Sequence, residues 1–156
     1  MRRVTIRPMT AADIEPCATL MAEAPLWQRY GVTVASASAR FESALRDGGL
    51  ILVADDGAGK PLGFVWVVLR GAFNRSGYIP LIGVDAGQRG GGIGQQLLAA
   101  AEDRLRQAAI QDMFLLCSDF NIDAQRFYQR QGYIQVGAIP DYVIPGITEL
   151  IFHKRL

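Results

Sequence analysis

A run of glycines between a predicted strand and a predicted helix constrains this chain more than any other feature. The run is Gly90-Gly91-Gly92-Ile93-Gly94, and Arg89 precedes it. Residues 78–84 form an apolar run with the length of a strand. After the glycines, apolar residues recur at helical spacing: Ile93, Leu97, Leu98, Ala101 and Leu105. Glycines at such a junction let consecutive backbone N–H groups face one concavity, where the helix dipole also favours anions. The run predicts an anion-binding loop, and the alternative is a flexible connection.

The spacing within the run separates it from two common nucleotide-binding loops. A P-loop ends in Gly-Lys-Ser/Thr, but Gln95 and Gln96 follow Gly94. A Rossmann fingerprint needs a third glycine at the place that Gln95 occupies, and it follows the first strand of a βαβ unit. The usual nucleotide hydrolases and dinucleotide-binding domains are therefore disfavoured.

The remaining chain predicts a mixed sheet with helices on both faces. Strands are expected at residues 4–7, 50–54, 62–69, 78–84, 113–117, 133–136 and 147–152. Helices are expected from a capping box at Thr10 to Pro25, over about 34–47, after the glycine run, and over 121–131. Residues 25–31 are predicted to be an aromatic-bearing loop. A hairpin meander followed by two β-α crossovers is typical of a mixed sheet.

Composition limits the functions that the chain can have. Its 156 residues suit one domain, and no apolar run approaches the roughly 20 residues of a membrane span. We therefore expect a cytoplasmic protein that does not bind membranes. The net charge of +1, without a basic cluster, argues against nucleic-acid binding. One histidine and two separated cysteines, Cys17 and Cys117, argue against a metal site, and both thiols are expected to be buried.

Two motifs together give the chain a resemblance to a known family. The first is Arg89-Gly90-Gly91-Gly92-Ile93-Gly94, which fits R-x-x-G-x-G, with Ala86 where proline is common. The second runs from Asn121 to Tyr133 and fits N-x-x-A-x-x-F-Y-x-x-x-G-Y. With this order of elements, the chain resembles the GNAT (Gcn5-related N-acetyltransferase) superfamily over essentially its whole length. The resemblance implies a single α/β (α+β) domain over residues 1–156. It also implies a mostly antiparallel sheet of six to seven strands with about four helices on both faces.

The resemblance also implies acetyl-CoA as the cofactor and assigns residues to it. The implied cofactor-binding residues are Ile82, Gly83, Val84, Arg89, Gly90, Gly91, Gly92, Ile93, Gly94, Gln95, Asn121, Phe127 and Tyr128. The backbone N–H of Ile82 would polarise the thioester carbonyl, and the phenol of Tyr128 would be the general acid for the leaving thiolate. Without the resemblance, Asn121 is also interpreted as a helix N-cap, and Phe127 and Tyr128 as core residues.

The acceptor side is less defined by the sequence. Tyr78 stands where some family members have a glutamate, so the general base is expected to be water, with Asp119 and Glu149 as alternatives. Aromatic loop and strand residues are candidates for the substrate-binding wall: Trp27, Tyr30, Tyr78 and Tyr142.

The leading interpretation is transfer of an acetyl group to a primary amine of a small molecule, by direct attack in a ternary complex. Cys117 has no histidine near it in sequence, which argues against a covalent acyl-enzyme. Acetylation of protein N-termini or lysines is one alternative, and a non-catalytic acyl-CoA sensor is another. A homodimer is possible if the C-terminal strand extends a partner's sheet.

Overall fold

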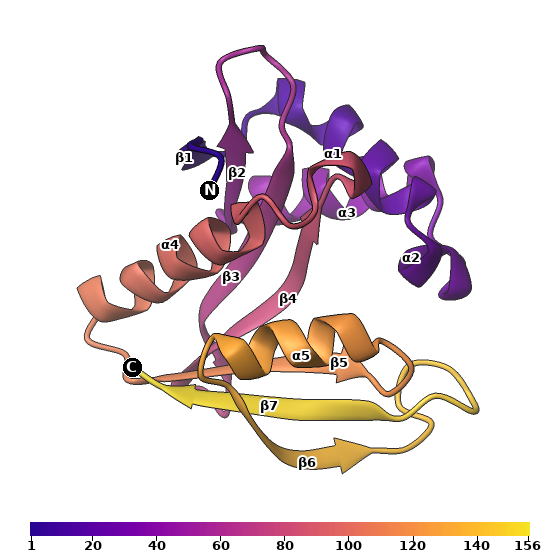
Figure 1. The fold of residues 1–156 in the computed structure, drawn as a ribbon, viewed down its shortest axis with the longest axis vertical. Coiled ribbons are helices and arrows are strands. Elements are labelled where there is room, and N and C mark those ends of the chain that lie inside the picture. The colour runs from indigo at the N-terminus through magenta and orange to yellow at the C-terminus, as the bar shows by residue number, and fades with distance from the viewer. The chain divides into compact units, whose positions relative to one another are not determined.

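The chain has seven strands and five α-helices, and they follow one another in the predicted order except that the short helix α2 replaces part of a predicted loop (Figure 1). The computed structural model describes all 156 residues. The strands are β1 (Thr5–Pro8), β2 (Leu50–Asp55), β3 (Gly63–Ala72), β4 (Ser76–Val84), β5 (Asp112–Ser118), β6 (Ile134–Ile139) and β7 (Glu149–Arg155). The helices are α1 (Ala11–Glu23), α2 (Pro25–Arg29), α3 (Val34–Arg46), α4 (Ile93–Gln107) and α5 (Ile122–Arg130).

The strands form one mixed sheet in the order β1-β2-β3-β4-β5-β7-β6. β4 and β5 pair in parallel, with Gly77 opposite Met113 and Ile79 opposite Leu115, whereas β1/β2, β2/β3, β5/β7 and β6/β7 are antiparallel. The predicted fold class is thereby confirmed. The C-terminal strand β7 lies between β5 and β6, so it has no free edge with which to extend a partner's sheet, and the dimer contact expected from the sequence is wrong. The outer strand is β6.

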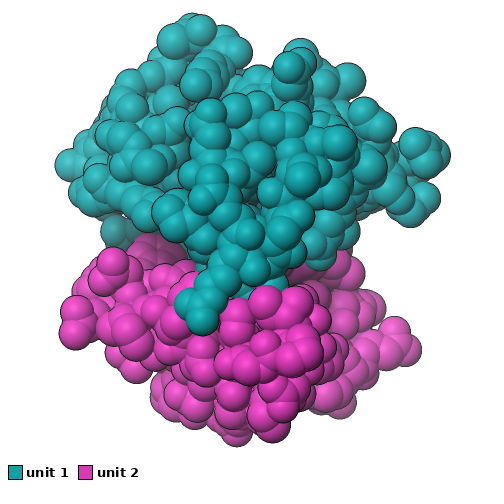
Figure 2. Space-filling model, turned by 90° about the vertical axis from the view of Figure 1, so that its right-hand side faces the viewer, with its two compact units in different colours: residues 1–67, 81–101 teal, residues 68–80, 102–156 magenta.

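The chain forms two compact units, coloured separately in Figure 2. Unit 1 contains residues 1–67 and 81–101, and unit 2 contains residues 68–80 and 102–156. Three elements, β3, β4 and α4, contribute residues to both units.

Unit 1 has helices on both faces of its strands. Because side chains alternate along a strand, Ile51 and Val53 of β2 point to the same face as Phe64 of β3, and these residues belong to one buried cluster with α1 and α3. On the other face, a Cβ atom added at Gly63 would lie 3.1 Å from Leu97 of α4. The apolar stripe predicted for α4 is buried, as expected.

Local sequence signals explain how the first helices begin and end. The capping box predicted for α1 is present, and Thr10 N–H donates to Asp13 Oδ2 at 2.8 Å. Asp13 is also bound by the Arg7 guanidinium, at 2.7 and 3.0 Å, and Arg7 Nε donates to Asp55 at 2.9 Å, so β1, α1 and β2 are joined by ion pairs. The loop prediction for residues 25–31 was wrong in part, because Pro25 occupies the first position of the short helix α2 and its ring favours helical φ there.

Unit 2 consists of β5, β7 and β6 with α5 and the end of α4, together with the β3–β4 hairpin. In Figure 1, α5 runs along β5 and β7. The buried side chains of Met113, Leu115 and Phe152 form part of its core. None of the chain's helices is long and apolar enough to cross a bilayer.

Candidate functional site

The loop between β4 and α4 has the backbone geometry of an anion cradle. Asp85 begins it with a turn in which its Oδ1 accepts from Gly87 N–H at 2.8 Å, and residues 86–88 form one 3₁₀ turn. Gly90 and Gly92 have φ values of +80° and +79°, a region in which side chains are strained. Gly92 O accepts from Gln96 N–H at 3.1 Å, so the amides of Ile93, Gly94 and Gln95 lie in the first turn of α4 and lack intrahelical acceptors.

The start of the chain lies against this loop, which sequence reasoning missed. Arg2 N–H donates to Gly91 O at 2.9 Å, and Gln96 Nε2 donates to Arg2 O at 2.7 Å. The Arg2 guanidinium hydrogen-bonds Gln88 and pairs with Asp56. These contacts are non-local backbone and side-chain contacts, for which the sequence carries no periodic signal. The Gly91 amide itself donates to Gln88 O at 3.3 Å, within the loop.

The end of β4 packs against Trp27 of α2. A Cβ atom at Gly83 would lie 2.7 Å from Trp27 Cη2 and 2.9 Å from Phe64 Cε1. The rings of Trp27 and Phe64 stack at 6.0 Å between centroids. Trp27 is thus a half-buried packing residue beside Ile82 and Val84, both of which are half-buried. Tyr30, also half-buried, ends α2, and its N–H donates to Trp27 O at 3.1 Å.

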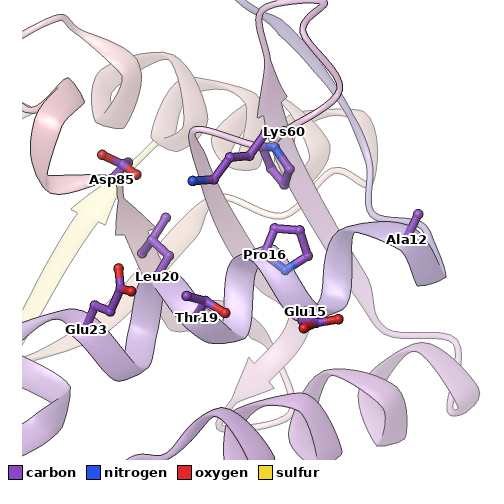
Figure 3. Close-up of a pocket in the computed structure, with 9 residues that line it drawn as sticks. Ala12, Glu15, Pro16, Thr19, Leu20, Glu23, Lys60 and Asp85 are labelled. Atoms are coloured by element: carbon purple, nitrogen blue, oxygen red, sulfur yellow. The ribbon is translucent and has the colours of Figure 1, made fainter.

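A groove of about 360 Å³ lies along α1 in unit 1 (Figure 3). Its lining residues are Ala12, Glu15, Pro16, Thr19, Leu20, Glu23, Lys60, Pro61 and Asp85. Three carboxylates and one ammonium group therefore border it. Asp85, at the start of the glycine loop, belongs to this lining. Sequence reasoning did not single out the groove, because its residues come from separate elements and form no motif.

In unit 2, the second motif forms α5 and its two ends. Asn121 is the N-cap, and its Oδ1 accepts from Ala124 N–H at 3.3 Å, so the capping interpretation is confirmed. Tyr128 is 7% exposed, and its ring lies between aromatic neighbours, with centroids 5.3 Å from Phe127 and 6.0 Å from both Tyr133 and Phe152. Burial, and to a smaller degree the neighbouring Cys117, raises the pKa of the Tyr128 hydroxyl above its usual value of about 10.

The other predicted residues of unit 2 lie on β4, on β7 and in the loops. Tyr78 of β4 stands opposite Phe114 of β5 and is half-buried, while Tyr142 is 59% exposed in the β6–β7 loop. Asp119 Oδ2 accepts from Thr148 N–H at 3.2 Å, and Glu149 is buried.

The cysteines have the properties of buried core residues. Cys17 and Cys117 are both buried, as predicted, and burial raises the pKa of each thiol to about 12. A thiol with so high a pKa is almost entirely protonated near neutral pH and is a poor nucleophile. The structure contains no cluster of three or more His, Cys, Asp or Glu residues that could hold a metal.

Several known acetyltransferases have related sequences. Blasticidin-S acetyltransferase of Streptomyces morookaense is 40% identical over 79 residues, which cover 51% of this chain and 57% of that protein. Mycothiol acetyltransferase of Salinispora tropica is 34% identical, over 70% of this chain and 37% of that protein. L-methionine sulfoximine/L-methionine sulfone acetyltransferase of Pseudomonas aeruginosa is 31% identical, over 74% of this chain and 68% of that protein. The matches to the first two relatives thus span less than two thirds of their lengths.

Solved structures share the fold of this chain, and a family model matches its sequence. An N-acetyltransferase from Staphylococcus aureus Mu50 has the same fold, with a TM-score of 0.79, 18% identity and 99% of each chain covered. The ribosomal-protein-alanine N-acetyltransferase from Brucella melitensis has a TM-score of 0.77, 21% identity and coverage of 97% and 99%. The model of the acetyltransferase (GNAT) family matches residues 14–133, which include both motifs. The resemblance is confirmed, and the chain belongs to the GNAT acetyltransferase family.

Proposed function

We propose that this chain is an acetyl-CoA-dependent N-acetyltransferase whose acceptor is a primary amine of a small molecule. The observation that carries the proposal is the glycine loop: two glycines with positive φ precede the unbonded first-turn amides of α4. Such a cradle suits a pyrophosphate, and a family model that includes it supports CoA as the source of that pyrophosphate.

On the donor side, the amides of Gly90, Gly92, Gly94 and Gln95 would bind the pyrophosphate. Gly91 would hold the loop in shape through its bonds to Gln88 and Arg2, while the Ile93 side chain is 1% exposed and fixes the start of α4 in the core. Arg89 is exposed and would add positive charge beside the cradle.

Along β4, backbone groups rather than side chains would act. Val84 would pair with the pantetheine arm as an added strand does, and the Ile82 N–H would donate to the thioester carbonyl. Gly83 lies between them. We infer that a glycine is needed there because the Trp27 ring fills the space that a Cβ atom would occupy. Asn121 and Phe127 would contact the donor from α5, as the motif implies.

The reaction requires one proton to leave the amine and one to reach the thiolate. The amine nitrogen would attack the carbonyl carbon, the C–S bond would break, and the departing thiolate, with a conjugate-acid pKa of about 8.5, would take up a proton. Because burial raises the pKa of Tyr128, its hydroxyl stays protonated at neutral pH and is always able to donate a hydrogen bond. The same shift makes complete proton transfer less favourable, so Tyr128 would stabilise the thiolate chiefly by hydrogen bonding.

The acceptor would lose its proton to water. Tyr78 carries no carboxylate, and the Asp119 carboxylate already accepts from the Thr148 backbone, which leaves it less suited to this role. Among the acceptor-side aromatics, Tyr30, Tyr78 and Tyr142 remain proposed wall residues. Trp27 would shape the wall indirectly, through its packing on Phe64.

The names of the relatives support a small-molecule acceptor. Blasticidin S and methionine sulfoximine are small molecules, and the proteins named for their acetylation are 40% and 31% identical to this chain over the matched residues. The neighbours that act on ribosomal proteins share the fold at lower identity.

Thiol release from acetyl-CoA tests this proposal directly. The purified chain is incubated with acetyl-CoA and a panel of amino acids, amino-acid analogues, aminonucleosides, polyamines and N-terminal peptides, and free thiol is measured with time. We expect release with at least one small amine, and a loss of about 100-fold in kcat for Tyr128→Phe. Release only with peptides would move the acceptor class to proteins. Tight CoA binding without turnover on any amine would instead identify a sensor.

We also propose that the chain forms a homodimer through the outer strand β6. Its side chains Ile134 and Val136 are 69% and 56% exposed, and residues 134–139 carry no charge. The opposite edge strand, β1, contains Arg7 and Pro8, which protect an edge against pairing. Light scattering should give twice the monomer mass for the unaltered chain and the monomer mass for Val136→Lys. A monomeric unaltered chain would contradict the dimer.

A further inference from the structure

We propose that Glu102 and Tyr133 are positioning residues for Tyr128: a buried ion pair holds the Tyr133 hydroxyl, and Tyr133 in turn fixes the ring and backbone of Tyr128. The inference rests on the proposed acetyltransferase function. It assigns a role to residues that neither the glycine loop nor the predicted donor and acceptor sites use.

The helix α5 ends in a turn that brings Tyr133 next to Tyr128. Gly132 has a φ of +90°, and two hydrogen bonds close the turn: Tyr133 N–H to Tyr128 O and Gly132 N–H to Gln129 O, both at 3.0 Å. This is a Schellman cap, in which the residue after the glycine packs on the residue three positions before the C-cap. The rings of Tyr133 and Tyr128 make that contact at 6.0 Å. The spacing of the F-Y-x-x-x-G-Y motif therefore places Tyr133 against Tyr128 by local backbone geometry.

The Tyr133 hydroxyl is hydrogen-bonded to a buried carboxylate. It donates to Glu102 Oε1 of α4 at 3.0 Å, and both residues are buried, at 2% and 5% exposure. Lys154 Nζ of β7 donates to both oxygens of the same carboxylate, at 2.9 and 3.0 Å, and Arg106 lies 3.5 Å from it. The Lys154 ammonium also lies over the Tyr133 ring, 5.6 Å from its centroid. We call Glu102, Tyr133, Lys154 and Arg106 the Glu102 network.

The charged groups of the Glu102 network fix geometry more than they add stability. A buried ion pair seldom stabilises a fold more than well-packed apolar residues of similar volume would, whereas a directed hydrogen bond to a charged group fixes geometry. Through the Glu102 hydrogen bond to its hydroxyl and the Lys154 ammonium over its ring, the network holds the Tyr133 phenol at a defined place. The Tyr133 backbone and ring then restrict Tyr128, which Phe152 contacts from β7 at 6.0 Å. Tyr128 is thus packed on several sides, which fixes the position of its ring and of the phenol oxygen.

The test separates positioning from general stability. Tyr133→Phe keeps the ring and the cap and removes only the bond to Glu102, while Glu102→Gln keeps an acceptor but no charge. Asp13→Asn in unit 1 is the matched control, because Asp13 is also a buried, arginine-bound carboxylate at 3% exposure. Steady-state kcat and KM for acetyl-CoA, and urea unfolding, are measured for each variant, alone and combined with Tyr128→Phe.

We expect Tyr133→Phe to lower kcat about tenfold with KM changed less than about twofold, because a small displacement of a positioned group is costly. Glu102→Ala, measured in the same way, should lower kcat more than Glu102→Gln, because it removes the acceptor as well as the charge. In the Tyr128→Phe background, Tyr133→Phe should have almost no further effect on kcat, since the hydroxyl that it positions is gone. Asp13→Asn should lose stability and keep its kcat.

Four results would overturn the inference. Losses in kcat that multiply in the double variant, or that match those of Asp13→Asn at equal stability, would show a purely structural network. A kcat of Tyr128→Phe equal to that of the unaltered chain would remove the group to be positioned. Absence of turnover by the unaltered chain would overturn the proposed function and this assignment with it, and it is distinguished from the other outcomes by needing no variant.

Discussion

From the contact between Gly83 and Trp27 we predict the loss of stability that a side chain at Gly83 would cause. Gly83 lies on β4, the strand that would carry the thioester-binding amide. A methyl group added by Gly83→Ala would lie 2.7 Å from Trp27 Cη2 and 2.9 Å from Phe64 Cε1. Ordinary carbon contacts lie at about 3.5–4.0 Å, so both rings would have to move by most of an ångström. Overpacking of this kind costs about 1–3 kcal/mol, which corresponds to a fall in Tm of roughly 2–12 °C for a chain of this length.

The assay is thermal and urea unfolding followed by far-UV circular dichroism, for Gly83→Ala, Trp27→Phe and the double variant. Trp27→Phe removes the ring atoms nearest to the added methyl group, so the double variant should regain part of the stability that Gly83→Ala loses. Additive losses in the double variant, or a Gly83→Ala protein as stable as the unaltered chain, would refute the packing argument. A kcat that falls while stability is restored would place the effect on the backbone of Ile82 and Val84.

Three further outcomes follow from named contacts. Asn121→Ala should cost about 1 kcal/mol of stability through loss of the cap to Ala124 N–H, measured by urea unfolding, whereas Asn121→Asp should keep it. The Arg7 hydrogen bonds hold the pKa of Asp13 below its unfolded value of about 3.9. The pair therefore stabilises the fold above that pH, and its contribution is lost as the pH falls through the folded pKa. Asp13→Asn should flatten the acid side of the profile of unfolding free energy against pH. Because burial raises the pKa of Cys117 to about 12, its alkylation at pH 8 should be slow in the native protein and fast in urea, and rapid native labelling would contradict the burial.

The sequence was most informative where local chemistry decides structure. The capping box at Thr10, the helical stripe from Ile93 to Leu105 and the helix over 121–131 were all predicted correctly, since each depends on neighbours within a few residues. The hairpin of β2 and β3 followed from its turn residues in the same way.

What the sequence could not predict depends on contacts between distant residues. Pro25 is compatible with both a loop and a first helical turn, and the helix α2 is accompanied by a long-range contact, the packing of Trp27 on Phe64, that the local sequence does not encode. The place of β7 between β5 and β6 is set by pairing across the sheet, which leaves no mark on a strand's own sequence. Arg2 binds the glycine loop, and Tyr133 binds Glu102. Both contacts join residues far apart in the sequence, and the residues around each of them form no motif that would predict the contact.

Product analysis tests the central claim most directly. The chain is incubated with acetyl-CoA and a small amine of the classes accepted in the panel, and both products are measured by mass spectrometry. We predict equal amounts of N-acetylated amine and free CoA with the unaltered chain, and formation about 100-fold slower with Tyr128→Phe. Free CoA without acetylated amine, or acetylated amine formed equally fast by Tyr128→Phe, would contradict it.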